Sequence, residues 1–99
     1  MQMMRAITLK GFGEVDMLQL SRIPKVALSR PTDVLIKVMA AGVNRADISQ
    51  RRGHFPPPKG VSEVLGLEVS GVVECVGDGV HNVKEGDKVM ALLSGGGYA

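Results

Sequence analysis

Residues 33–53 read DVLIKVMAAGVNRADISQRRG, and this stretch predicts a long strand that runs directly into a short helix. The strand, residues 33–43, is apolar on both faces, with Val34, Ile36, Val38 and Ala40 on one face and Leu35, Met39 and Ala41 on the other. Because such a pattern is typical of the middle of a sheet, we expect this strand to be central and buried. Asn44 is a favourable N-cap, and residues 45–50 contain no helix breaker before Gly53, so they predict a helix.

Four further apolar segments flank this stretch and are separated by Gly, Pro and Asp residues. They are residues 5–9, 17–23, 68–77 and 88–92, which alternate or are rich in β-branched side chains. Gly71 interrupts the third segment and indicates a bend or the close approach of another backbone. Residues 51–60 (RRGHFPPPKG) predict a loop beside a cleft or, alternatively, a proline-rich ligand for a recognition domain. Five or six strands with one short helix indicate a mainly β domain, either a barrel or a sandwich.

The composition is that of an ordinary soluble domain. The 99 residues suit one domain, and 44% apolar with 22% charged residues indicates neither disorder nor a fibrous repeat. A formal charge of +2 is too small to indicate a nucleic-acid partner, and the adjacent Arg51 and Arg52 support one only weakly. No apolar run approaches the roughly 18–20 residues that span a bilayer. We therefore expect no membrane or nucleic-acid partner, and the single cysteine, Cys75, agrees with a cytoplasmic protein.

Five motifs occur in an order that points to a known family. They are NRAD (44–47), PPPKG (56–60), LGLEVSGVV (65–73), VGDGV (76–80) and GDKVMALLSGGGYA (86–99). Together they resemble the catalytic domain of zinc-independent quinone oxidoreductases of the medium-chain dehydrogenase/reductase superfamily. The resemblance implies a GroES-like, partly open β-barrel over residues 1–99, a following Rossmann domain that binds NADPH, and a homodimer at full length. We expect the Rossmann domain to be absent from this chain, because the glycines at 95–97 open no helix.

The resemblance also implies a site that lacks metal ligands. Zinc-dependent relatives carry a cysteine at the position of Asn44 and a histidine at that of Leu67, and a catalytic zinc normally takes three ligands from His, Cys, Asp and Glu. The family's structural zinc lobe needs four cysteines, whereas this chain has one. We therefore expect no zinc. His54 and His81 have no matching partners, and Ala46 stands where zinc-dependent relatives often place a proton-relay hydroxyl.

The candidate site residues are Asn44, Arg45, Asp47, Phe55 and Glu68. Asn44 is a catalytic and cofactor-binding candidate, because its amide can orient a nicotinamide ring or a quinone oxygen while it also caps the helix. Arg45 either meets a cofactor phosphate or faces solvent. Asp47 is a catalytic candidate, although an acid in the first turn also favours the helix dipole. Glu68 is expected near the cofactor, paired with a cation or with backbone donors. Phe55 matches a tyrosine of some relatives and offers cofactor and substrate an apolar wall without the hydroxyl.

These expectations lead to one main hypothesis and two alternatives. The main hypothesis is an enzyme that, when complete, transfers hydride from NADPH to a quinone without zinc, while the isolated 99 residues are inactive. A quinone suits such a site, because its ring delocalises the charge that a metal would otherwise stabilise. The first alternative reduces enoyl or enone double bonds on the same scaffold. The second is a non-catalytic GroES-like binding or assembly module, since most contacts with the cofactor belong to the other domain.

Overall fold

The chain forms five strands and one short α-helix in the part that the computed structural model describes, residues 1–54, 56–57 and 59–99. In chain order the elements are β1 (Met3–Leu9), the 3-10 turn η1 (Val15–Met17), β2 (Leu18–Pro24), β3 (Val34–Ala41), α1 (Arg45–Arg51), β4 (Glu68–Val76) and β5 (Lys88–Leu92). The expectation of a mainly β domain with one short helix is confirmed. None of the helical residues described belongs to a helix long and apolar enough to cross a membrane.

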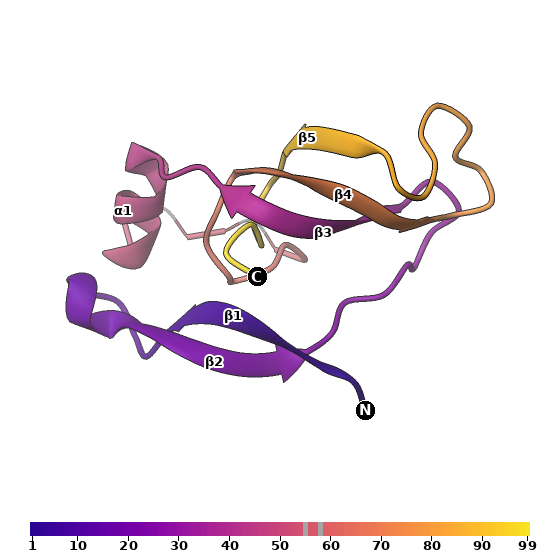
Figure 1. Cartoon of the computed structure of the whole chain (residues 1–99). Helices are drawn as coiled ribbons and strands as arrows, with labels where there is room; N and C mark the ends of the chain where they lie inside the picture. Colours follow the sequence, from indigo (N-terminus) through magenta and orange to yellow (C-terminus); the bar gives the residue numbers. More distant parts are fainter. Residues whose placement is uncertain (55, 58) are drawn as a thin grey trace.

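The strands form two antiparallel sheets that face each other. One sheet is the β1–β2 hairpin, and the other has the order β3–β4–β5. Figure 1 shows the hairpin beneath the three-stranded sheet, α1 at one end of both, and the C-terminal segment between them. The backbone N–H of Ile7 in β1 donates to the carbonyl of Tyr98 at 2.9 Å, so this C-terminal segment is hydrogen-bonded to the hairpin. Because the strands pair within two separate sheets, the arrangement stays open rather than closing into a continuous barrel.

The prediction that β3 is a central, buried strand is wrong. This strand lies at an edge of its sheet, and every one of its residues is half-buried or exposed, whereas β4 is the central strand. β4 supplies the buried Val69 and Val73, and Val73 is only 1% exposed. The pairing of β3 with β4 has two register irregularities, between Leu35 and Ile36 and between Val38 and Ala40. They change which β3 side chains face inward, so the simple alternation of the sequence does not persist along the strand.

Gly71 lets β3 and β4 approach closely. It pairs with Val38 on one side and Val89 on the other, in the middle of the central strand. A Cβ atom at this position would collide with the carbonyl oxygen of Lys37 and lie 2.9 Å from the Cγ2 of Ile36. The close backbone approach expected from a glycine in this strand is confirmed.

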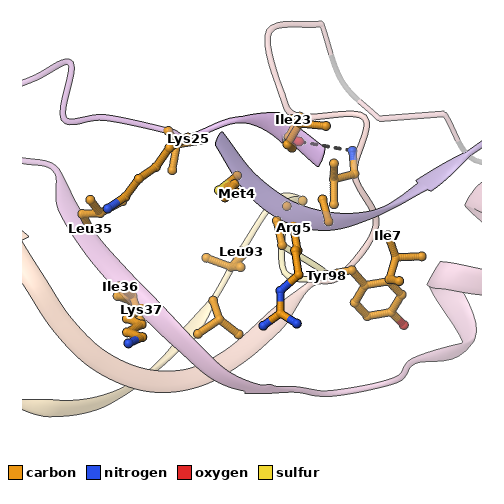
Figure 2. Close-up of a pocket in the computed structure, with 18 of the residues that line it drawn as sticks. Met4, Arg5, Ile7, Ile23, Lys25, Leu35, Ile36, Lys37, Leu93 and Tyr98 are labelled. Atoms are coloured by element: carbon orange, nitrogen blue, oxygen red, sulfur yellow. Dashed lines mark hydrogen bonds between the residues drawn. The ribbon is translucent and has the colours of Figure 1, made fainter. Parts of the chain in front are cut away.

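The core between the sheets is small. Among the described residues, its buried apolar side chains are those of Ala6, Leu65, Val69 and Val73. An open hollow of about 650 Å³ also lies between the two sheets, and Figure 2 shows Met4, Leu35 and Tyr98 around it. At its edge an ion pair of 2.9 Å joins Lys25 Nζ, just after β2, to Glu74 Oε2 of β4. This ion pair links the segment after β2 to the three-stranded sheet.

Candidate functional site

The turn from β3 into α1 presents the two polar side chains that the NRAD motif begins with. Asn44 has an extended backbone (φ −127°, ψ 156°), and α1 begins at the next residue, so its predicted N-cap position is confirmed. The helix continues through Arg51, one residue beyond the predicted end. Asn44 is half-buried and Arg45 is exposed. Both side chains therefore border solvent at the end of β3, where a ligand can reach them.

Asp47 is buried beneath this turn, with 4% of its surface exposed. Its Oδ2 atom accepts a hydrogen bond from the backbone N–H of Asn44 at 2.9 Å and a second from the hydroxyl of Tyr98 at 2.6 Å. Its Oδ1 atom is also buried and has no hydrogen-bond partner among the described residues. The first-turn position predicted for this acid is confirmed, and in addition the carboxylate links the start of α1 to a residue 51 positions away.

Tyr98 is a member of this site that the sequence did not predict. Its backbone N–H donates to the carbonyl of Leu65 and its own carbonyl accepts from Ile7, both at 2.9 Å. Burial, followed by the hydrogen bond and the charge of Asp47, raises the pKa of Tyr98 from its ordinary value of 10.0 to about 12. The hydroxyl is therefore protonated at neutral pH and donates a hydrogen bond to Asp47. The only signal in the sequence was that Tyr98 is its single tyrosine.

Glu68 lies beside the same turn, at the first position of β4. Its carbonyl accepts a hydrogen bond from the N–H of Gly42 at 3.1 Å. Its exposed side chain covers Gly42, since a Cβ atom on that glycine would lie 2.6 Å from the Cγ and Cδ of Glu68. None of the ion pairs found among the described residues involves Glu68. The structure thus places Glu68 next to the segment that leads to Asn44, with its carboxylate open to solvent.

Two arginines fix the other end of α1. Arg51 is buried, and its guanidinium donates to the carbonyl of Gly13 at 3.1 Å and to Glu14 at 3.4 Å. Arg52 reaches the same carboxylate at 3.2 and 3.3 Å. Because both cations are paired with Glu14, they join the helix to the loop before η1. This pairing gives the Arg51–Arg52 pair a structural role within the domain.

The positions that bind zinc in related enzymes hold no set of metal ligands here. The side chains of Asn44 and Leu67 are an amide and an alkyl group, neither of which is a usual zinc ligand. In the described part of the chain, no group of three or more His, Cys, Asp or Glu residues lies close enough to hold a metal ion. His54 and His81 are both exposed. The prediction for Phe55 concerns a residue outside those that the structure describes.

An apolar hollow of about 510 Å³ separates α1 from the β1–β2 hairpin. Its walls are mainly aliphatic and include Val15, Leu18, Leu20, Val43, Ile48 and Leu65. Asp47 and Tyr98 also line it. Val43, which directly precedes Asn44, is 80% exposed. The amide-bearing turn therefore has an apolar, solvent-accessible surface next to it.

A two-sheet β domain with a capped helix after its first long strand defines the class of this protein. The alcohol dehydrogenase GroES-like domain family matches residues 30–98. The chain belongs to this family and thus to the medium-chain dehydrogenase/reductase superfamily, and the partly open, GroES-like fold expected from the sequence is confirmed.

Sequence relatives extend this likeness over almost the whole chain. The synaptic vesicle membrane protein VAT-1 homolog-like of Mus musculus is 40% identical over 100 residues, covering 99% of this chain and 23% of the relative. The quinone oxidoreductase of Lama guanicoe is 37% identical over 99 residues, covering 99% of this chain and 30% of the relative. The chain thus spans less than a third of the length of either relative.

Solved structures give the same result. The quinone oxidoreductase from Coxiella burnetii matches with a TM-score of 0.81 and 36% identity, over 92% of this chain and 30% of that one. The Escherichia coli quinone oxidoreductase, solved in complex with NADPH, matches with a TM-score of 0.70 and 30% identity, over 91% of this chain and 27% of that one.

Proposed function

We propose that the protein containing this domain is an oxidoreductase that transfers hydride from NADPH to a quinone without a catalytic zinc. The observation that carries the proposal is the pair of side chains at the two zinc-ligand positions, Asn44 and Leu67, on a fold shared with quinone oxidoreductases. Carbonyl reduction without a Lewis acid leaves a developing alkoxide unstabilised, whereas a quinone spreads the charge over its ring. The side chains at these two positions therefore suit the reduction of a quinone better than that of a simple ketone.

The residues at the β3–α1 turn fit a nicotinamide cofactor bound at the edge of the domain. NADPH, when bound, supplies the hydride. Asn44 offers an amide donor and acceptor to the nicotinamide or to the acceptor oxygen, and the exposed Arg45 is free to approach a phosphate. Glu68 lies beside the turn, and because its carboxylate would repel a phosphate, we propose that the pyrophosphate binds away from it. The apolar hollow next to Val43 offers aliphatic surface to a flat ring.

Chelation separates this proposal from a zinc mechanism. The full-length protein is treated with a chelator and then assayed for the loss of NADPH absorbance with a simple para-quinone as acceptor. We expect undiminished turnover. Activity that disappears on chelation and returns with zinc contradicts the proposal. The same assay on residues 1–99 alone checks the expected inactivity of the isolated domain, which any measurable turnover overturns.

The role of Asn44 is tested by substitution. We expect Asn44→Ala to lower kcat/KM about tenfold to a hundredfold, because it removes an amide donor at the reacting ring. Asn82→Ala is the matched control, since it removes an exposed amide from the loop before β5. Equal activity of the two variants rules out a contribution of the Asn44 amide.

Acceptor preference decides between the quinone and its nearest alternative. Rates are compared with a quinone and with an enone at equal NADPH concentration. A higher kcat/KM for the quinone supports the proposal, and a higher value for the enone identifies a double-bond reductase. The homodimer and the cytoplasmic location stay predictions, which light scattering of the full-length protein and its distribution between cell fractions test.

A further inference from the structure

We propose that Tyr98 is a positioning residue for the β3–α1 turn, because its hydroxyl holds the Asp47 oxygen that also binds the backbone N–H of Asn44. The two hydrogen bonds are 2.6 Å and 2.9 Å long and meet on a single atom, Oδ2. A shift of the carboxylate would therefore move Asn44 with it. The catalytic consequence of this arrangement rests on the function proposed above, whereas the arrangement itself does not.

Burial makes Asp47 depend on these two donors. Its other oxygen, Oδ1, is buried and unpartnered among the described residues, and the residue as a whole is 4% exposed. A buried charged group that loses a donor is costly, because water cannot replace the missing hydrogen bond without a rearrangement. Removal of the Tyr98 hydroxyl would leave the Asn44 N–H as the single described donor, so the carboxylate would turn toward solvent and draw the helix start with it.

The position of the Tyr98 hydroxyl is set independently of α1. The backbone of Tyr98 is hydrogen-bonded on both sides, to Leu65 and to Ile7. Its ring lies against Gly66, where a Cβ atom would be 2.8 Å from the ring carbon Cδ1. Gly66 also has a φ of +107°, in the region that favours glycine, so a larger residue is excluded both by conformation and by space. Tyr98 thus provides a fixed point, held by β1 and by the loop before β4, from which Asp47 and the turn are held.

The test compares two variants of the full-length protein that each lose one hydroxyl. Tyr98→Phe removes the hydrogen bond to Asp47. Ser21→Ala is the matched control, because it removes a partly buried hydroxyl pair of the same 2.6 Å length, to Thr8, within the β1–β2 hairpin. A merely structural effect would appear in both variants, whereas positioning of the turn belongs to Tyr98 alone.

Two readouts are measured on each variant. The first is hydrogen exchange at the backbone N–H of Asn44, which we expect to be at least about tenfold faster in Tyr98→Phe and unchanged in Ser21→Ala. The second is quinone reduction, for which we expect kcat to fall about tenfold in Tyr98→Phe while the KM for NADPH changes less than about twofold. Unchanged exchange at Asn44 overturns the proposal. Faster exchange with unchanged kcat overturns its catalytic part.

Further outcomes separate this inference from the proposed function. A wild-type protein without any quinone reduction refutes the proposed function, and exchange at Asn44 then still decides whether Tyr98 positions the turn. If Tyr98→Phe does not fold, Asp47→Asn serves instead. This substitution is made in the 99-residue chain, where Tyr98 is the single tyrosine and there is no tryptophan, so its ionisation is followed directly by absorbance. We expect a midpoint near pH 12 in the wild type and a lower one in Asp47→Asn, because the substitution removes the charge of Asp47 but not the burial of Tyr98; identical midpoints contradict the contact.

Discussion

Replacement of Gly71 by alanine tests the contact on which the three-stranded sheet depends. The new Cβ atom would collide with the carbonyl oxygen of Lys37 and lie 3.0 Å from the carbonyl carbon of the same residue. Backbone atoms of a paired strand cannot rotate away as a side chain can, so β3 must move outward. Overpacking of this kind costs about 1–3 kcal/mol, and weakening one ladder hydrogen bond adds roughly 0.5–1.5 kcal/mol. We therefore expect a loss of about 3 kcal/mol in the free energy of unfolding.

The assay is thermal unfolding followed by circular dichroism. For a domain of this size, a loss of about 3 kcal/mol lowers Tm by roughly 12–24 °C. Gly42→Ala is the matched control, because the three atoms nearest to its Cβ atom all belong to the Glu68 side chain, which is exposed and free to swing aside. We expect that control to lose less than about 1 kcal/mol. A Gly71→Ala protein that unfolds within a few degrees of the wild type refutes the close approach of β3 and β4.

Three further predictions concern charged and ionisable groups. The pKa of Tyr98 is raised to about 12, so the stability that its neutral hydroxyl contributes is complete below pH 10 and is lost between pH 10 and 12. We expect alkaline unfolding to follow the appearance of tyrosinate absorbance. Unfolding that is complete below pH 10 contradicts this prediction. Arg51→Ala should lower the free energy of unfolding, measured by chemical denaturation, by about 1.5–3 kcal/mol, because a buried guanidinium and its hydrogen bond to Gly13 are lost. Arg52→Ala should lower it by less than about 1 kcal/mol, because Arg52 is exposed. Equal losses contradict the difference in burial. Hydrogen bonds from the backbone N–H of Ser29, from its hydroxyl and from Arg30 lower the pKa of Asp33 below 3.8, so wild-type stability should fall as the pH drops below about 4, and Asp33→Asn should show a smaller decrease in acid denaturation.

Elements whose limits are set by nearby residues were predictable from the sequence. The β5 strand has the predicted bounds, Lys88–Leu92, and α1 begins directly after its predicted cap. A turn before the strand and an asparagine before the helix act locally, so the tertiary structure does not alter them. β2 begins one residue later than expected, because the 3-10 turn Val15–Met17 precedes it.

The position of β3 was not predictable from its apolar pattern. The pattern shows that both faces carry apolar side chains, but it does not show which strands pair with them. In the structure, Met39 of β3 and Met90 and Leu92 of β5 are exposed by 69%, 86% and 87%. The three-stranded sheet therefore keeps an apolar outer surface, and the strand that the sequence suggested as central owes part of its apolar character to this surface.

The candidate site was predictable only where its contacts are local. The spacing of Asn44 and Asp47 within one helical turn indicates their reciprocal contact, and the bond between them is present. The contact with Tyr98 depends on how the C-terminal segment returns between the sheets, which no spacing in the sequence reveals. The proximity of Glu68 to Gly42 depends in the same way on the pairing of β3 with β4.

The burial of Asp47 distinguishes it from Asn44, although the sequence made both residues catalytic candidates. Oδ1 is closed to solvent and Oδ2 is occupied by two donors, so the carboxylate reaches a ligand only after the turn rearranges. The half-buried amide of Asn44 lies at the surface and reaches a ligand without such a change. Within the described residues of the NRAD motif, Ala46 has no proton to give and Asp47 is held inside. Under the proposed function, we therefore expect solvent, rather than Ala46 or Asp47, to protonate the reduced ring.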